Sequence, residues 1–163
     1  MTFVYVSIGS NIDRAANVRT AVDALRRHYG DLTISSVYES AAVGFAGENF
    51  YNLVVRFDTP ESVERVAQYL HDIENSQRRD RAAPRFSSRT IDLDLLLYGD
   101  LVRDTGEVQV PRDDINTYAF VLAPLAEIAG DEKHPVTGRR YAELWHDFNK
   151  AKQPLWAVDV PLS

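Results

Sequence analysis

The sequence predicts an α+β protein with a ferredoxin-like β-α-β-β-α-β core, in which helices lie on one face of an antiparallel sheet. Two amphipathic helical patterns alternate with four apolar strand patterns in that order between residues 2 and 98. The chain of 163 residues fits a single domain, residues 1–163, that can bury a sizeable core. Additional helices are expected in the C-terminal part, where they could cover the open face of the sheet.

The elements of the first half follow from apolar periodicity and turn residues. Residues 2 to 8 are predicted as a buried strand that ends in the turn sequence GSN. A helix follows, because four apolar residues have the i, i+3, i+4, i+7 spacing of one helical face: Val18, Ala21, Val22 and Leu25. Strands near residues 32 to 39 and 50 to 58 come next, joined by the loop AAVGFAGE.

The second helix is predicted to begin with Thr59 as N-cap and Pro60 in its first turn. Its apolar face consists of Val63, Val66, Ala67, Leu70 and Ile73. The fourth strand is expected from Thr90 to Tyr98. After it we expect a short strand near 107 to 110 and helices at about 119 to 129 and 141 to 149.

Glu74 continues the apolar face of the second helix. It has the same helical phase as Val63, Ala67 and Leu70, so its carboxylate is predicted to face the sheet. The alternative is fraying of the last turn, which would let the side chain swing into water. A carboxylate held against the sheet would be available to a ligand there.

Composition limits the classes of function. A net charge of -6 and a pI of about 5.2 argue against general binding to nucleic acids or anionic membranes. The absence of cysteine removes disulfides, zinc thiolates and a thiol nucleophile, and the four histidines form no spaced metal set. The start of the sequence lacks the pattern of a signal peptide, so a cytoplasmic protein is expected.

The most unusual charge distribution lies between Arg78 and Gly99. Residues 78 to 89 hold five arginines and one aspartate, within a chain of net charge -6. Asp92 and Asp94 follow in the fourth strand, where the alternation of side chains places both on one face, about 6.6 Å apart. Carboxylates so placed suit a hard cation such as Mg²⁺, and arginines suit phosphate oxygens.

A purely structural interpretation of the two aspartates is also open. An antiparallel strand with one wet face can carry acids outward while Ile91, Leu93 and Leu95 face the core. The arginine run counts against this interpretation, because an electropositive loop between a helix and a core strand of an acidic chain needs a reason. We therefore predict a metal and polyphosphate site at this strand.

Several sequence blocks occur together and in order: VSIGSN, SSVYESAAVGF, FYNLVV, RTIDLDLLLYGD, and VP followed by FVLAPLAEIA. With them, residues 4 to about 130 resemble the 6-hydroxymethyl-7,8-dihydropterin pyrophosphokinases of folate biosynthesis. The resemblance implies an ATP-dependent diphosphotransferase. It would transfer diphosphate from ATP to the hydroxymethyl group of the pterin and release AMP.

The resemblance also implies residues for ATP and its metal ions. Two Mg²⁺ ions would be held by Asp92 and Asp94, which count as metal ligands and catalytic residues. Arginines would contact the phosphates, and the loop carrying some of them would close over the substrates and exclude water. The implied catalytic arginines are Arg79, Arg81 and Arg89, and the implied ATP-binding set adds Glu74, Arg85 and Arg112.

For the pterin, the resemblance implies a pocket of polar groups between aromatic rings. Ser40, Val43 and Asn52 would lie at the edge of the heterocycle, with Phe50 and Phe120 on its two faces. Phe86 matches the tryptophan of the family's closing loop. The alternative is that Phe50 and Phe120 are core residues and that Asn52 is a hydrogen-bonded strand amide.

Some positions depart from the family pattern. Arg112 stands where the family has a histidine, Asp113 follows it, and Tyr118 stands where an arginine is expected. Glu107 replaces what is often a basic residue, and Arg78 replaces a glycine. The changes from 107 to 118 are expected on one side of the nucleotide pocket, so weakened ATP binding is predicted.

Three functions remain open at this point. The first is an active Mg²⁺-dependent pyrophosphokinase that acts as a monomer on ATP and a hydroxymethyl dihydropterin, without nucleic acid or membrane. The second is a divergent homologue that binds pterin or nucleotide without catalysis. A ferredoxin-like RNA-binding module is the third, and both the acidic charge and the lack of an aromatic and basic sheet signature oppose it.

Overall fold

The computed structural model describes residues 1–41, 48–78, 91–106 and 108–162. Its first elements follow the predicted β-α-β-β-α-β order of a ferredoxin-like α+β fold. They are β1 (Thr2–Ser10), α1 (Arg14–Tyr29), β2 (Thr33–Ile34), β3 (Val37–Ser40), β4 (Phe50–Thr59), α2 (Val63–Arg78) and β5 (Asp92–Tyr98). The later elements are β6 (Arg103–Thr105), β7 (Val108–Val110), α3 (Asp114–Thr117), α4 (Ala119–Ala129), α5 (Tyr141–Asp147), a 3-10 helix (Lys150–Lys152) and β8 (Leu155–Val158).

The main sheet is antiparallel and has the strand order β5-β1-β4-β3-β8, with β2 also paired to β4. The central strand β1 pairs with β4 from Thr2↔Thr59 to Ser10↔Tyr51. On its other side it pairs with β5, and this ladder ends at Gly9↔Asp92. Strands β6 and β7 form a separate hairpin beside the end of β5.

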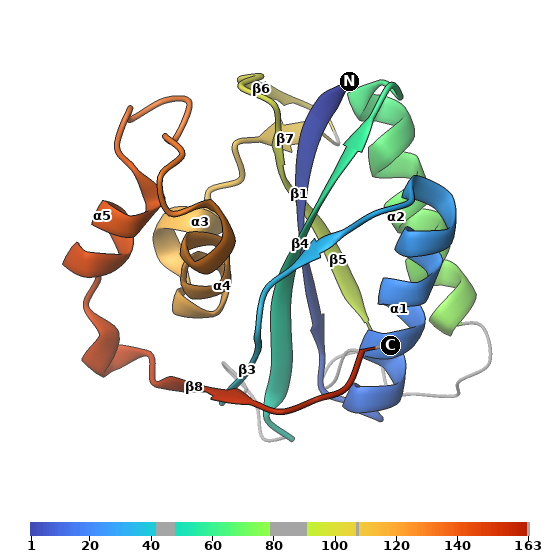
Figure 1. Cartoon of the computed structure of the whole chain (residues 1–163), viewed down its shortest axis with the longest axis horizontal. Coiled ribbons are helices and arrows are strands. Elements are labelled where there is room, and N and C mark those ends of the chain that lie inside the picture. Colours follow the sequence, from blue (N-terminus) through green and yellow to red (C-terminus); the bar gives the residue numbers. More distant parts are fainter. Residues whose placement is uncertain (42–47, 79–90, 107, 163) are drawn as a thin grey trace.

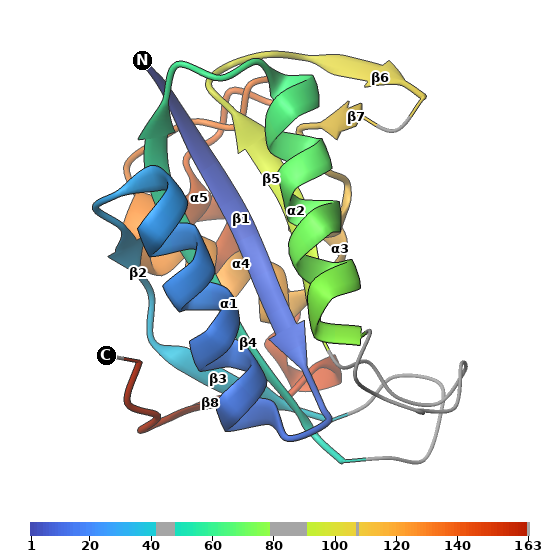
Figure 2. The same cartoon turned by 90° about the vertical axis from the view of Figure 1, so that its right-hand side faces the viewer.

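Helices cover both faces of the sheet (Figure 1). Helices α1 and α2 lie on one face, side by side, as Figure 2 shows, whereas α3, α4 and α5 lie on the other. Alternate side chains of each strand point to opposite faces, so Val4 and Val6 join the α1/α2 core while Tyr5 joins the α4 core. The prediction that C-terminal helices cover the open face of the ferredoxin-like sheet is confirmed.

The apolar faces predicted for the two long helices are in the core. Val18, Ala21, Val22 and Leu25 of α1 are fully buried. In α2 the buried residues are Val63, Val66, Leu70 and Ile73, and Ala67 is half-buried against them. Leu93 and Leu95 of β5 face the same core, as does Ile91 just before the strand, which is expected from alternation.

A β-bulge in β5 changes this alternation beyond the aspartates. Tyr5 pairs with Leu97 and Val6 with Leu95, so Leu96 is an extra residue between two rungs of the ladder. As a result Leu96 and Leu97 both pack against the α4 side. The Leu96 carbonyl accepts a hydrogen bond from the N–H of Arg112 at 3.0 Å. The bulge thereby attaches the segment that leads into α3.

Two predicted boundaries are wrong, for local reasons. The strand expected at 32 to 39 is divided into β2 and β3, because Ser35 uses its backbone N–H and its hydroxyl to bond both backbone groups of Val54, at 3.0 and 2.9 Å. Thr59 is the last residue of β4 and does not cap α2. That role belongs to Ser62, whose hydroxyl accepts the N–H of Arg65 at 3.2 Å.

The C-terminal part also differs in detail from the prediction. The strand expected near 107 to 110 is β7, and its hairpin partner β6 was not predicted. Strand β8 was missed as well, although it extends the main sheet by pairing with β3 from Val37↔Val158 to Ser40↔Leu155. Among the described residues, no helix is long and apolar enough to cross a membrane.

His134 is buried in the turn between α4 and α5, with 4% of its surface exposed. Its Nδ1 accepts hydrogen bonds from the backbone N–H groups of Val136 and Thr137, at 3.1 and 3.2 Å. Burial lowers the pKa of this imidazole, and the negative charge of Asp113 opposes the shift only in part. Nδ1 accepts two N–H groups and is therefore the unprotonated nitrogen of the folded ring.

A folded-state pKa below the ordinary value of 6.5 means that the unfolded chain binds the proton more readily. His134 therefore contributes stability that is present above that value and is lost as the pH falls below it. His134→Asn keeps an oxygen acceptor but cannot titrate, so its free energy of unfolding should depend less on pH between about 7.5 and 5. Urea unfolding across this range measures both proteins. Identical pH slopes for parent and variant would contradict the prediction.

Candidate functional site

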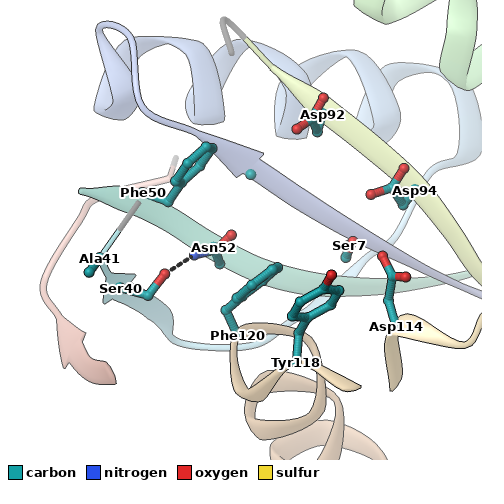
Figure 3. A pocket seen from close by; sticks show the side chains of 11 residues that line it. Ser7, Ser40, Ala41, Phe50, Asn52, Asp92, Asp94, Asp114, Tyr118 and Phe120 are labelled. Carbon is teal, nitrogen blue, oxygen red and sulfur yellow. Dashed lines mark hydrogen bonds between the residues drawn. The ribbon is translucent and has the colours of Figure 1, made fainter. Parts of the chain in front are cut away.

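A cavity of about 380 Å³ opens at the end of the sheet where β1, β4 and β5 face the start of α4. Figure 3 shows its lining side chains, which divide into an acidic wall on β5, an amide and hydroxyl group on β3 and β4, and aromatic rings. The lining residues are Ser7, Gly9, Ser40, Ala41, Phe50, Asn52, Asp92, Asp94, Asp114, Tyr118 and Phe120.

The acidic wall is built by the alternation of β5. Asp92 and Asp94 both point into the cavity, whereas Leu93 between them is buried in the core on the opposite face. This confirms that the two aspartates share one face of the strand. Asp114, from the short helix α3, brings a third carboxylate to the same cavity. The wall is therefore strongly negative unless cations approach it.

One such cation is Arg112, which leads into α3. Its Nη2 lies 3.6 Å from Asp94 Oδ1, and its Nε lies 3.1 Å from Asp114 Oδ2. Burial alone would lower the pKa of Arg112, but the charge of Asp94 and the contact with Asp114 raise it above its usual range. The guanidinium thus offsets the repulsion between the two carboxylates.

The opposite wall holds a buried polar pair. Asn52 and Ser40 are only 5% and 7% exposed, and Asn52 Nδ2 donates to Ser40 Oγ at 2.9 Å. Asn52 Oδ1 lies beside Gly9, where an added Cβ would come within 2.9 Å of it. Glycine at position 9 therefore leaves room for the Asn52 carboxamide, on the opposite side of β1 from β5 and its aspartates.

Aromatic side chains complete the cavity. Tyr118 and Phe120 stack with ring centroids 4.9 Å apart at the start of α4. Phe50 lies on the other side of Asn52, at the beginning of β4 (Figure 3). Phe50 and Phe120 are half-buried and line the cavity, and Phe120 also packs against the α4 core, so the choice between pocket wall and core residue stays a prediction. A flat ligand between them would meet rings and an amide edge.

A second, smaller cavity of about 230 Å³ adjoins Asp94 on the side of α2 and β7. Glu74 lines it and accepts a hydrogen bond at Oε2 from the Leu93 N–H, at 2.9 Å. The Glu74 side chain is 13% exposed, so the helix end holds it against the sheet as predicted. Arg112 and Gln109 line the same space. Asp94 is thus shared by both cavities.

The structure separates the positions that depart from the family pattern. Arg112 borders the second cavity, whereas Tyr118 lies in the first and stacks on Phe120. Asp113 is exposed. The expectation that these positions lie on one side of a nucleotide pocket stays a prediction.

The remaining predicted site residues lie outside the described part of the chain. They are Val43, Arg79, Arg81, Arg85, Phe86 and Arg89, and the departure Glu107 is outside it as well. Within residues 1–41, 48–78, 91–106 and 108–162, no three His, Asp or Glu side chains are arranged to hold a metal ion by themselves. Two carboxylates are nevertheless the usual protein share of a Mg²⁺ site completed by phosphates and water.

Sequence reasoning missed four residues of the larger cavity, Ser7, Gly9, Ala41 and Asp114, and it expected Tyr118 beside the nucleotide. Ser7 and Gly9 lie within the block VSIGSN, opposite Asp94 and Asp92 in the ladder between β1 and β5. Period-2 alternation along the first strand predicts that both residues share one face. It does not predict on which side of the sheet that face lies. Asp114 gives no periodic signal, because its position depends on the turn after Pro111.

A protein family model described as 7,8-dihydro-6-hydroxymethylpterin-pyrophosphokinase (HPPK) matches residues 5–130. A 2-amino-4-hydroxy-6-hydroxymethyldihydropteridine pyrophosphokinase of Bacillus subtilis is 37% identical over 128 residues, which cover 76% of this chain and 76% of that protein. The protein of the same name from Pseudomonas aeruginosa is 36% identical over 145 residues, covering 86% of this chain and 88% of its own.

Solved structures share the fold. A crystal structure of an HPPK-DHPS in complex with substrates has a TM-score of 0.72 at 10% identity and covers 92% of this chain. The wild-type Plasmodium falciparum HPPK-DHPS with pterin and p-hydroxybenzoate has a TM-score of 0.65 at 14% identity and covers 89%. This chain spans only 44% and 42% of those two chains. At such identities the likeness concerns the fold alone.

The contact between Glu74 and Leu93 yields a stability prediction. Glu74→Ala leaves the Leu93 N–H of edge strand β5 without this charged acceptor, which should lower the free energy of unfolding by ~1.5 to 3 kcal/mol. Glu64→Ala is a matched control, because Glu64 lies on the same helix and pairs with Arg103 in an exposed position. Denaturant unfolding should show a clearly larger loss for Glu74→Ala, and equal losses would refute the structural role of this contact.

Proposed function

Since the chain belongs to the 7,8-dihydro-6-hydroxymethylpterin pyrophosphokinase family, we propose that the cavity of about 380 Å³ is where it transfers diphosphate from ATP to 6-hydroxymethyl-7,8-dihydropterin. The chain is an ATP-dependent pyrophosphokinase, a transferase of folate biosynthesis. Its products are AMP and the pterin diphosphate. One observation carries the proposal for the site. The paired carboxylates of β5 face the same cavity as the amide and aromatic walls.

The pterin occupies the amide and aromatic side of the cavity. Its flat ring lies between Phe50 and Phe120, where stacking and desolvation stabilise it. Asn52 and Ser40 then meet the polar edge of the heterocycle. Val43 is assigned to the same edge from the family pattern alone. The buried Asn52–Ser40 hydrogen bond holds the amide in one orientation, so little ordering is needed when the pterin binds.

The triphosphate of ATP lies toward the acidic wall, where Asp92 and Asp94 would hold Mg²⁺, two ions in all. Bound there, the metal would neutralise charge on the phosphate oxygens and align them for transfer. Carboxylate oxygens from one strand face suit a cation that takes its remaining ligands from phosphate and water. Arg112 stands beside Asp94, within reach of the same phosphates.

The nucleoside end of ATP lies in the second cavity, beside Glu74 and Arg112. Arg79, Arg81, Arg85 and Arg89 contact the phosphates in this proposal, and Phe86 helps to close the site. Their roles rest on the arginine-rich sequence and the family pattern. Always-charged guanidinium groups bind phosphate oxygens bidentately, which supports this assignment.

The reaction requires alignment more than covalent participation by the protein. The hydroxymethyl oxygen of the pterin attacks the β-phosphorus of ATP, and the bond from this phosphorus to the α,β-bridging oxygen breaks. The hydroxyl proton passes to water. AMP leaves with that oxygen, and the diphosphate remains on the pterin. Holding the two substrates in adjacent parts of one pocket supplies the proximity that such a displacement needs.

The whole chain, residues 1–163, acts in this proposal as one domain and as a monomer. Strand β8 is part of the same sheet as β1, which supports a single unit. The proposed partners are small molecules, ATP and the pterin.

AMP release from ATP, with and without the pterin and Mg²⁺, tests the function directly. We expect release that requires both, and Asp94→Asn should lower the turnover about 10²-fold, or ~2.7 kcal/mol, while pterin affinity stays nearly unchanged. Asp100→Asn is the control, because Asp100 is exposed in the turn after β5. Full turnover in Asp94→Asn would refute the metal assignment. Ligand binding without any AMP release by the parent would favour the non-catalytic homologue.

Phe120→Ala tests the aromatic wall. If the ring covers one face of the pterin, the variant should bind pterin more weakly by ~1 to 1.5 kcal/mol, as expected for one lost stacking contact. Phe148→Ala removes another half-buried aromatic ring, which stacks on Trp145 away from the cavity. Calorimetric titration and denaturant unfolding should be measured on both. Unchanged pterin affinity in a destabilised Phe120→Ala would show that the ring serves the core only.

A further inference from the structure

The C-terminal segment connects two walls of the larger cavity. Strand β8 pairs with β3, and this ladder ends where Leu155 lies opposite Ser40, a residue that lines the cavity. Just before β8, Gln153 reaches the junction between α3 and α4. In Figure 1 the segment runs along the bottom of the view from α5 to β8, which lies beside β3. It therefore touches both the β3 wall and the α4 wall.

Gln153 makes two hydrogen bonds that flank Tyr118. Its Oε1 accepts the Ala119 N–H at 2.8 Å, and its Nε2 donates to the Thr117 carbonyl at 2.9 Å. Ala119 is the first residue of α4, and the N–H groups of a first helical turn have no partner within the helix. Tyr118, the N-cap residue, makes no capping side-chain hydrogen bond in the described structure. Gln153 thus caps α4 from a distant part of the chain.

The position of the aromatic wall depends on this junction. Tyr118 has an extended backbone, with φ -119° and ψ 126°, between α3 and α4. Phe120, in the first turn of α4, faces the cavity. A hollow of about 270 Å³ lies between this wall and the C-terminal segment, lined by Phe120, Gln153 and Leu155 among others. Packing behind the rings is therefore incomplete. The buried residues Ala119 and Val121 anchor the start of α4, and the two Gln153 hydrogen bonds hold the backbone on either side of Tyr118.

We propose that Gln153 is a positioning residue for pterin binding, which acts by holding the backbone on both sides of Tyr118 and so the orientation of Phe120. The proposal rests on the proposed function of the cavity and adds to it a residue outside the family-matched stretch, residues 5–130. Gln153 supports one face of the pterin site and does not contact the acidic wall. Its loss should therefore affect the pterin far more than ATP.

Two substitutions and one control test the proposal. Gln153→Ala removes both hydrogen bonds, whereas Gln153→Glu keeps an oxygen for the Ala119 N–H but cannot donate to Thr117. Gln68→Ala is the matched control, because the Gln68 amide is exposed on α2, donates to Asp72 at 3.0 Å and does not line the cavity. Amide hydrogen exchange at Ala119, KM for pterin and KM for ATP are measured for each protein.

Gln153→Ala should speed exchange at the Ala119 amide and raise the KM for pterin about tenfold, the equivalent of one to two hydrogen bonds, with the KM for ATP within about twofold. Gln153→Glu should keep the Ala119 amide protected and raise the KM for pterin less. Gln68→Ala should resemble the parent in all three measurements.

Other results would overturn the proposal. A Gln153→Ala protein with faster exchange but an unchanged KM for pterin would show that the cap is structural only. Equal rises in both KM values would show a general loss of order. Absence of pterin-dependent AMP release in the parent would instead refute the proposed function. In that case an unchanged exchange rate at Ala119 in Gln153→Ala would still overturn the positioning role.

Discussion

The antiparallel pairing of β1 with both β4 and β5 is the constraint on which the fold and the site depend. Gly9, near the end of β1, lies opposite Asn52 on one side and Asp92 on the other. A slip of one residue in either ladder would turn the cavity-facing side chains of that strand toward the α1/α2 core. The buried residues Leu93 and Leu53 oppose such a slip, because they would then be exposed to the cavity. Hydrophobic burial therefore fixes where the polar residues meet.

Electrostatics then governs the acidic wall. Asp94 lies on the same face of β5 as Asp92, and Arg112 contacts both Asp94 and Asp114. A cation that binds Asp94 has to compete with this guanidinium or share the carboxylate with it. In the described structure, the family's departure at position 112 thus contacts the acid at the centre of the proposed site. The departure at Tyr118 has a different consequence, since it enlarges the aromatic wall.

The two edges of the sheet are protected in different ways, and each protection lies next to the site. On the β5 edge, the Glu74 carboxylate accepts the Leu93 N–H, which is adjacent in sequence to both cavity aspartates. On the other side, β8 pairs with β3 as the outer strand, so Ser40 lies on a strand that is paired on both sides. Protection of an exposed strand edge and support of a ligand pocket are therefore achieved by the same residues.

Local patterns in the sequence determined most of the core and the chemistry of one wall. The helical spacing of Val18 and Leu25 and the alternation of Asp92, Leu93 and Asp94 are properties of short segments, because helix and strand periods decide which side chains share a face. The phase of α2 likewise predicted that Glu74 faces the sheet. The ATP and pterin residues were predicted through resemblance to a family, beyond what periodicity alone supports.

Only the tertiary structure decided which of these faces come together. Ser7 and Gly9 reach the cavity through their register with β5, and Asp114 reaches it through the turn before α3. Gln153 reaches the start of α4 through the return of the chain to β3. Each placement depends on contacts between residues far apart in the sequence. A periodic pattern gives the phase of one element, but it contains no information on the register between elements or on the partner of a side chain. The pairing of β8 with β3 and the contacts of Gln153, just before β8, therefore could be found only in the folded chain.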